Sequence, residues 1–197
     1  KSARMEGYLF PDTYRIFDGA TLDGIVIKML DNFDKKITPD LRAEIEKQKK
    51  TLSEIITIAS LIEKEVATDE DRAIVSGILW KRLDAGIPLQ VDATVIYAKN
   101  QELGTPEGVA PRPYGAGRNQ GNGKISLADT KINSPYNTYR YRGLPPGPIA
   151  NPGLSAIRAA IYPKPSPYLY YLSAPDGRTI FSRTLDEHNT AKARYLR

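Results

Sequence analysis

The segment at 51–67 constrains the fold of this chain more than any other, because it has the signals of a capped and strongly apolar helix. Thr51 and Glu54 form a capping box, in which the Thr hydroxyl and the Glu carboxylate each meet a free backbone N–H. Apolar side chains then recur at three- and four-residue steps, at Leu52, Ile55, Ala59, Ile62 and Val66. A helix with such a stripe has to bury it, so we expect the other elements to pack around residues 52–67.

One carboxyl in this helix is placed where it could do chemistry. Glu63 lies one helical turn from both Ala59 and Ala67, at the border of the predicted buried face, whereas Lys64 and Glu65 project elsewhere. Apolar neighbours disfavour the charged form of a carboxyl, so a Glu at such a border can hold a proton and give it to a leaving group. The alternative is an ordinary helix-border Glu whose carboxylate extends into water. Spacing alone leaves both interpretations open.

The composition excludes several kinds of site. The chain of 197 residues has no cysteine, which excludes disulfides, thiolate catalysis and cysteine metal sites. Its single histidine, His188, excludes a His-rich metal site, and we expect neither a metal nor a cofactor. The net charge is +5, and residues 101–197 hold 13 basic and 6 acidic side chains. This basic half indicates either an anionic partner, such as nucleic acid, a lipid surface or an acidic polymer, or simply a solvated basic surface.

Periodicity and turn signals predict an α+β fold in which a small antiparallel sheet accompanies the helices. Helices are expected at 21–36, 39–50 and 52–67, from Thr68 to Gly86, from Asp92 onward, and at 154–161 and 184–196. The sheet is expected from 6–17 together with a hairpin of 167–174 and 178–182. Residues 100–124 are rich in Gly, Pro and Asn and indicate a long surface loop.

A second non-periodic segment, 133–153, is dense in Tyr, Pro and Gly. Prolines fix φ and glycines permit close approach, so this loop is predicted to be rigid. Tyr faces and Asn amides on a rigid loop suit a carbohydrate ligand. They equally suit a structural loop that packs over the core and uses Tyr for contact area.

Several blocks taken together resemble the YceG-like family of endolytic murein transglycosylases, the MltG type. They follow the family order and span nearly the whole chain. The blocks are Glu6-Gly-Tyr-Leu-Phe-Pro-Asp-Thr-Tyr14, Ala59-Ser-Leu-Ile-Glu-Lys-Glu65, Leu89-Gln-Val-Asp-Ala-Thr-Val-Ile-Tyr97, Ser134-Pro-Tyr-Asn-Thr-Tyr139, Gly143-Leu-Pro-Pro-Gly-Pro-Ile149, Asn151-Pro-Gly153 and His188-Asn189.

The resemblance implies a lyase that cleaves the β-1,4 bond between N-acetylmuramic acid and N-acetylglucosamine in nascent glycan strands and leaves 1,6-anhydromuramoyl ends. The family's catalytic glutamate is the first Glu of the Glu-Lys-Glu motif, here Glu63. Family members are anchored in the cell membrane by an N-terminal helix, carry a LysM-like module, and act outside the cytoplasm. We therefore expect residues 1–197 to be a single catalytic domain with a lysozyme- or transglycosylase-like active site, cut from such a protein. The expected partners are peptidoglycan strands and the cell-wall synthesis machinery.

The candidate site residues follow from these blocks. Glu63 is the expected catalytic residue, and Glu6 and Glu65 are candidates for supporting it. The candidates for binding or orienting the glycan are Gln90, Asp92, Tyr97, Tyr136, Asn137, Thr138 and Tyr139. Two rivals stay open: a hydrolytic muramidase, in which a second carboxylate activates water, and a non-catalytic peptidoglycan-binding module. No nucleic-acid motif is readable in the sequence.

Overall fold

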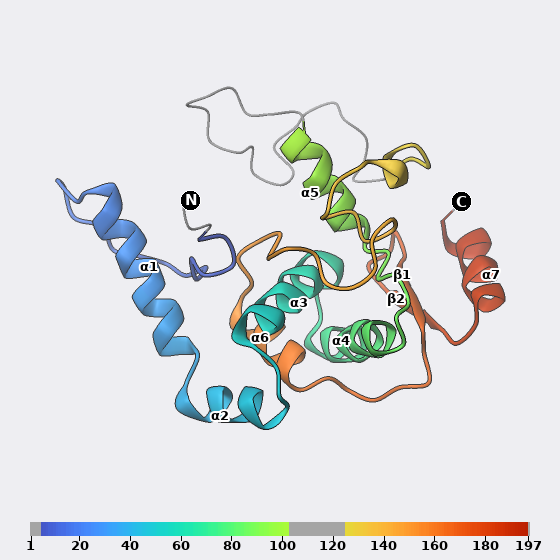
Figure 1. The fold of residues 1–197 in the computed structure, drawn as a ribbon, viewed down its shortest axis with the longest axis horizontal. Helices are drawn as coiled ribbons and strands as arrows, with labels where there is room; N and C mark the ends of the chain where they lie inside the picture. Colours follow the sequence, from blue (N-terminus) through green and yellow to red (C-terminus); the bar gives the residue numbers. More distant parts are fainter. Residues whose placement is uncertain (1–4, 103–124, 197) are drawn as a thin grey trace. The chain divides into compact units, whose positions relative to one another are not determined.

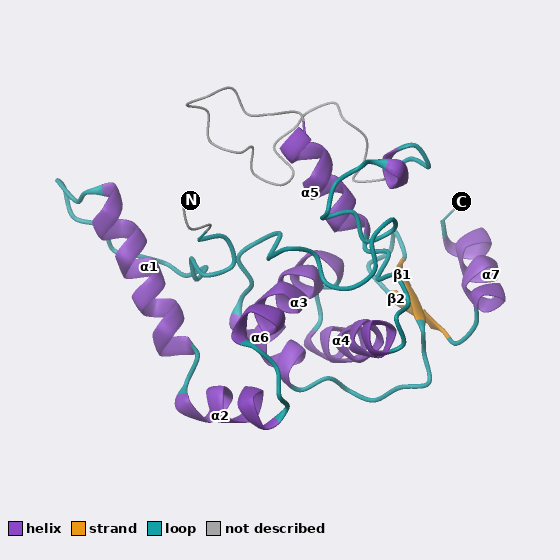
Figure 2. Ribbon diagram, viewed as in Figure 1, coloured by secondary structure: helices purple, strands orange, loops and turns teal. Residues whose placement is uncertain are grey.

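The computed structural model describes residues 5–102 and 125–196. Within them the chain forms seven α-helices, one 3-10 helix and a two-stranded antiparallel sheet (Figures 1 and 2). The α-helices are α1 (Leu22–Lys36), α2 (Pro39–Lys47), α3 (Leu52–Glu65), α4 (Asp69–Asp84), α5 (Asp92–Glu102), α6 (Leu154–Ile161) and α7 (Leu185–Tyr195). The other elements are η1 (Asp129–Lys131), β1 (Tyr170–Ser173) and β2 (Thr179–Ser182). The predicted α+β class is therefore confirmed, and most of the predicted loop at 100–124 lies outside the described residues.

The chain divides into two compact units. The first comprises residues 1–81 and 147–197, and the second comprises residues 82–146. The expectation of a single catalytic domain over 1–197 stays a prediction. In neither unit do the described residues include a helix with the length and apolar character needed to cross a lipid bilayer.

Helix α3 forms the centre of the first unit. Its capping box is present: the Glu54 N–H donates to the Thr51 hydroxyl (3.2 Å), and the Thr51 N–H donates to the Glu54 carboxylate (2.7 Å). The eight consecutive residues from Ile55 to Ile62 are all buried, so α3 is enclosed on every side over two turns. It packs chiefly on α6, which lies beside it in Figure 1, and also on α2. The prediction that helices pack around the helix that carries Glu63 is confirmed.

The hairpin prediction is also confirmed, with shorter strands. Tyr170 pairs with Ser182 and Ser173 with Thr179, and Gly177 makes the turn with φ +85°. Helix α7 packs on both strands, and a small core of Leu172, Ala174, Ala191, Ile180 and Tyr195 forms there.

The expectation that residues 6–17 add a strand to this sheet is wrong. The segment forms turns and loop, because a side chain takes its backbone donors: the N–H groups of Gly7 and Leu9 both donate to the Asn151 side-chain oxygen. Tyr8 and Phe10 contact helix α1 instead of a sheet: the Tyr8 and Phe33 ring centroids lie 5.2 Å apart, and the Lys36 ammonium lies 5.2 Å from the Phe10 ring, whereas Phe17 is 80% exposed. The aromatic residues of the first half of this segment therefore reflect packing on α1 and not strand pairing.

The second unit is organised around α5. The Lys99 ammonium lies 2.8 Å from the Asp129 carboxylate, which joins α5 to η1. Lys99, with the Ser126 backbone and hydroxyl donors, lowers the pKa of Asp129 from its ordinary value of 3.8 to about 2.

This lowered pKa predicts a small acid-dependent loss of stability. A carboxylate whose pKa is depressed by folding stabilises the fold above its unfolded value, and that contribution disappears as the pH falls from about 3.8 through about 2. Over this window we expect the melting temperature of Asp129→Asn to fall less than that of the unsubstituted chain. Equal slopes in melting experiments across this pH range would contradict the prediction.

Candidate functional site

Glu63 lies in the last turn of α3 with 29% of its side chain exposed, so it is neither buried nor free in water. One carboxylate oxygen, Oε2, accepts the Gly153 N–H at 3.3 Å. The other, Oε1, lies 3.6 Å from the Arg72 guanidinium. Gly153 is the N-cap of α6, where a helix presents its positive end. Glu63 directly follows the buried residues 55–62 and is partly exposed, which agrees with the predicted border position, but its two polar partners, a cation and an amide donor, were not predicted.

Arg72 is itself held in place. Its Nε donates to the Val66 carbonyl at the C-cap of α3 (3.3 Å), and its Nη1 lies 3.4 Å from Asp69. Its side chain is 15% exposed. The guanidinium therefore joins the end of α3 to the start of α4 and faces Glu63. Sequence reasoning missed Arg72, since a basic residue in a first helical turn carries no distinctive signal.

The loop 147–153 is fastened to α3 next to Glu63. The Ile149 N–H donates to the Ser60 hydroxyl (3.0 Å), and that hydroxyl donates to the Thr57 carbonyl (2.7 Å). Ser60 is fully buried and lies one turn before Glu63. With the Gly153 contact, two hydrogen bonds fix this loop to one face of α3, so this part of the loop is rigid for structural reasons.

The N-terminal block joins the same assembly. The Asn151 Oδ1 atom accepts the Gly7 N–H at 2.7 Å and the Leu9 N–H at 3.3 Å. Glu6, one residue earlier, is partly buried. Glu65 is also partly buried, and its backbone carbonyl accepts the Ser173 hydroxyl at 3.1 Å. A supporting role for Glu6 and Glu65 stays a prediction.

All seven candidates for glycan binding lie in the second unit, and four of them form two pairs. The Tyr139 hydroxyl donates to the Asp92 carboxylate, and the ring centroids of Tyr97 and Tyr136 lie 4.7 Å apart. Gln90 adopts a left-handed backbone with φ +54°. Its side-chain oxygen accepts a hydrogen bond from Arg82 (2.6 Å).

The seven candidates differ in how exposed their side chains are to a ligand. Gln90 and Asp92 are exposed, and Tyr97 and Tyr139 are half-buried. Asn137, Thr138 and Tyr136 are buried, at 0%, 1% and 6% exposure. Direct glycan contact is therefore most accessible to the first four, and a glycan-binding role for any of the seven stays a prediction.

The buried members have structural partners. The Asn137 amide nitrogen donates to the carbonyls of Thr130 (3.0 Å) and Ile132 (2.8 Å), and its oxygen accepts the Tyr139 N–H (3.0 Å). The Thr138 hydroxyl accepts the Val91 N–H at 3.0 Å. These contacts hold the loop at 133–141 in shape.

We expect Asn137→Ala to lower the free energy of unfolding by about 2–3 kcal/mol, because it removes the three hydrogen bonds that the buried Asn137 side chain makes with partly buried backbone groups. Asn133→Ala is the matched control: Asn133 is exposed, its side-chain oxygen accepts the Tyr141 hydroxyl, and the loss of this contact should cost under about 0.5 kcal/mol. Chemical denaturation of both variants measures the difference. Similar midpoints for the two would show that Asn137 does not support the loop.

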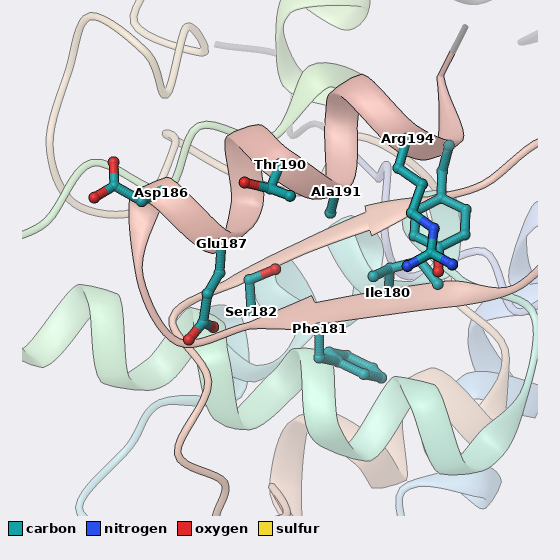
Figure 3. A pocket seen from close by; sticks show the side chains of 9 residues that line it. Ile180, Phe181, Ser182, Asp186, Glu187, Thr190, Ala191 and Arg194 are labelled. Atoms are coloured by element: carbon teal, nitrogen blue, oxygen red, sulfur yellow. The ribbon is translucent and has the colours of Figure 1, made fainter.

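A shallow hollow of about 490 Å³ lies between β2 and α7 (Figure 3). Asp186, Glu187 and Arg194 lie along it with Ile180 and Ala191. None of its lining residues is a candidate site residue. Among the described residues, no three His, Asp or Glu side chains are grouped to hold a metal ion.

Comparison with known proteins places this arrangement in context. The model of the YceG-like family matches residues 1–194. The endolytic murein transglycosylase of Bacillus subtilis (strain 168) is 37% identical over 192 residues, which are 98% of this chain and 48% of that protein. The endolytic murein transglycosylase of Streptococcus pneumoniae serotype 2 (strain D39 / NCTC 7466) is 34% identical over 197 residues, 98% of this chain and 32% of that protein.

A solved structure agrees with the fold. The crystal structure of a yceG-like protein from Listeria monocytogenes superimposes with a TM-score of 0.79 at 38% identity, covering 95% of this chain and 55% of that one. The present chain thus spans about half or less of the length of these curated relatives.

Proposed function

The chain belongs to the YceG-like family, and from that premise we propose that it is the catalytic part of an endolytic peptidoglycan lytic transglycosylase. It would cleave the β-1,4 bond between N-acetylmuramic acid and N-acetylglucosamine inside nascent glycan strands. The observation that carries the proposal is the setting of Glu63: a partly exposed carboxyl directly after the buried residues 55–62 of α3, with a partner on each oxygen.

In the proposed reaction Glu63 acts twice. Its protonated carboxyl gives a proton to the glycosidic oxygen, the C1–O bond breaks, and the electron pair leaves with that oxygen, which becomes the 4-hydroxyl of N-acetylglucosamine. The resulting carboxylate then accepts the proton of the muramic acid C6 hydroxyl as that oxygen bonds to C1. The anhydro ring closes, Glu63 is protonated again, and no water is consumed.

This chemistry requires one carboxyl, because the nucleophile belongs to the substrate. An ordinary glycosidase needs two, either to activate water or to form a covalent intermediate. The setting of Glu63 suits the single-carboxyl mechanism, because the Gly153 amide can donate to the carboxylate that exists between the two proton transfers.

The finer parts of the proposal rest on the family. We assign glycan contacts first to the accessible Gln90, Asp92, Tyr97 and Tyr139, and a shaping role to Tyr136, Asn137 and Thr138. The domain would be part of a protein anchored in the membrane. It would act outside the cytoplasm, close to the cell-wall synthesis machinery.

The products of digestion test the reaction. The complete protein is incubated with uncrosslinked glycan strands, and the ends are identified by mass spectrometry. We expect 1,6-anhydromuramoyl ends. Reducing ends, which are heavier by one water, would instead establish a hydrolytic muramidase. Strand binding without cleavage, unchanged in Glu63→Gln, would establish a binding module.

A further inference from the structure

The Arg72 side chain lies next to Glu63 but neither gives nor accepts a proton in the proposed reaction. Its guanidinium lies 3.6 Å from Glu63 Oε1, and both side chains are largely withdrawn from solvent, at 15% and 29% exposure. Charges so placed interact more strongly than a pair on the open surface, because fewer water molecules screen them.

The position of Arg72 is set independently of Glu63. The hydrogen bond from its Nε to Val66 and the ion pair with Asp69 fix the guanidinium to the α3–α4 junction even when the Glu63 carboxyl moves or changes its charge. A preorganised cation needs no rearrangement when negative charge appears beside it, which is the condition under which it stabilises a transition state.

The distance also leaves room for the substrate. At 3.6 Å Arg72 acts on Oε1 through its charge and not through a short hydrogen bond, whereas Oε2 is occupied by the Gly153 N–H. Oε1 is therefore the oxygen able to exchange a proton with the glycan while it keeps a cation close by.

We propose that Arg72 is a positioning residue for the transglycosylase reaction, which orients the Glu63 carboxyl and stabilises the carboxylate formed as its proton leaves. The inference rests on the proposed function. It goes beyond it in assigning the proton-transfer atom to Oε1 and the charge that assists the transfer to Arg72.

The kinetic test compares three variants of the complete protein on uncrosslinked strands. Arg72→Met keeps the apolar stem and removes the charge, and we expect kcat to fall about tenfold with KM little changed, since the lost interaction is stronger in the transition state than in the ground state. Arg72→Lys restores a charge without the fork that reaches Val66 and Asp69, and should recover part of that loss. Glu70→Gln is the control: Glu70 is 76% exposed and pairs with Lys164 on the surface, so this variant should keep wild-type turnover.

A purely structural role for Arg72 predicts a different result. Melting temperature would then fall in Arg72→Met and Arg72→Lys alike, with kcat per folded molecule unchanged, and that result would overturn the inference.

A double-mutant cycle gives a readout that needs no activity. Melting temperatures are measured for the wild type, Glu63→Gln, Arg72→Met and the double variant. We expect the double variant to lose less than the two single losses combined, because either substitution alone already breaks the pair. Strict additivity would overturn the inference even if the wild type produces anhydro ends.

Absence of anhydro ends from the wild type would instead refute the proposed function. The role of Arg72 in that reaction would then be refuted too, whatever the double-mutant cycle shows.

Discussion

Glu63→Gln is expected to fold normally and to lower turnover on glycan strands by a factor of about 10² to 10⁴, the usual size of general acid–base catalysis. Glutamine preserves the shape of the side chain and can still accept the Gly153 N–H through its amide oxygen, so the loop at 147–153 should stay in place. It cannot give a proton to the glycosidic oxygen or take one from the C6 hydroxyl. The rate of release of anhydromuramoyl fragments measures the loss.

Glu70→Gln is the matched control for this substitution. Glu70 belongs to the first unit and forms an ion pair with Lys164 on the surface (3.3 Å), with 76% of the Glu70 side chain exposed. The same chemical change there should leave both melting temperature and turnover near those of the wild type. A folded Glu63→Gln variant that cleaves strands about as fast as Glu70→Gln would remove Glu63 from the mechanism.

Gly7→Ala is expected to destabilise the first unit by about 2–5 kcal/mol, from two causes that act together. Gly7 has φ +94°, a backbone conformation that side chains with a Cβ rarely adopt. A Cβ at this position would also lie 2.7 Å from Pro148 Cβ and 2.9 Å from Ile56 Cγ2, closer than packed atoms approach. Because the Gly7 N–H bonds to Asn151, the displacement should reach the loop that contacts Glu63. Thermal and chemical denaturation measure the loss of stability.

Gly19→Ala separates these two causes. Gly19 has a similar φ of +84°, but a Cβ there would meet no atom within 4 Å. It should therefore cost only the backbone term, about 1–2 kcal/mol. If Gly7→Ala were no more destabilising than Gly19→Ala, the close packing of Gly7 against Pro148 and Ile56 would be refuted.

Much of the secondary structure could be predicted from the sequence because its signals are local. The capping box at Thr51 and Glu54 and the apolar spacing that follows lie within a few residues of one another, and they mark α3 whatever packs around it. The same holds for the hairpin turn at Gly177 and for α6. Ordered blocks along the chain indicated the family, and Glu63 with it, since a motif is read in one dimension.

Contacts between segments that lie far apart in the chain could not be predicted from the sequence. Residues 6–17 are rich in aromatics, which predicts a strand, yet the Asn151 side chain, 144 and 142 residues away, accepts the N–H groups of Gly7 and Leu9. Asn137 has the amide that a sugar-binding residue would use. In the structure its side chain is buried and hydrogen-bonds to three backbone groups.

Arg72 shows the same limit at the candidate active site. Nothing in its neighbourhood along the chain marks it, and only the turn between α3 and α4 brings its guanidinium to Glu63. Helix periods and caps are set by interactions over three or four residues, which the sequence displays directly. Burial, side-chain partners and the charges around a carboxyl depend on how different elements pack on one another, and that is decided only when the tertiary structure forms.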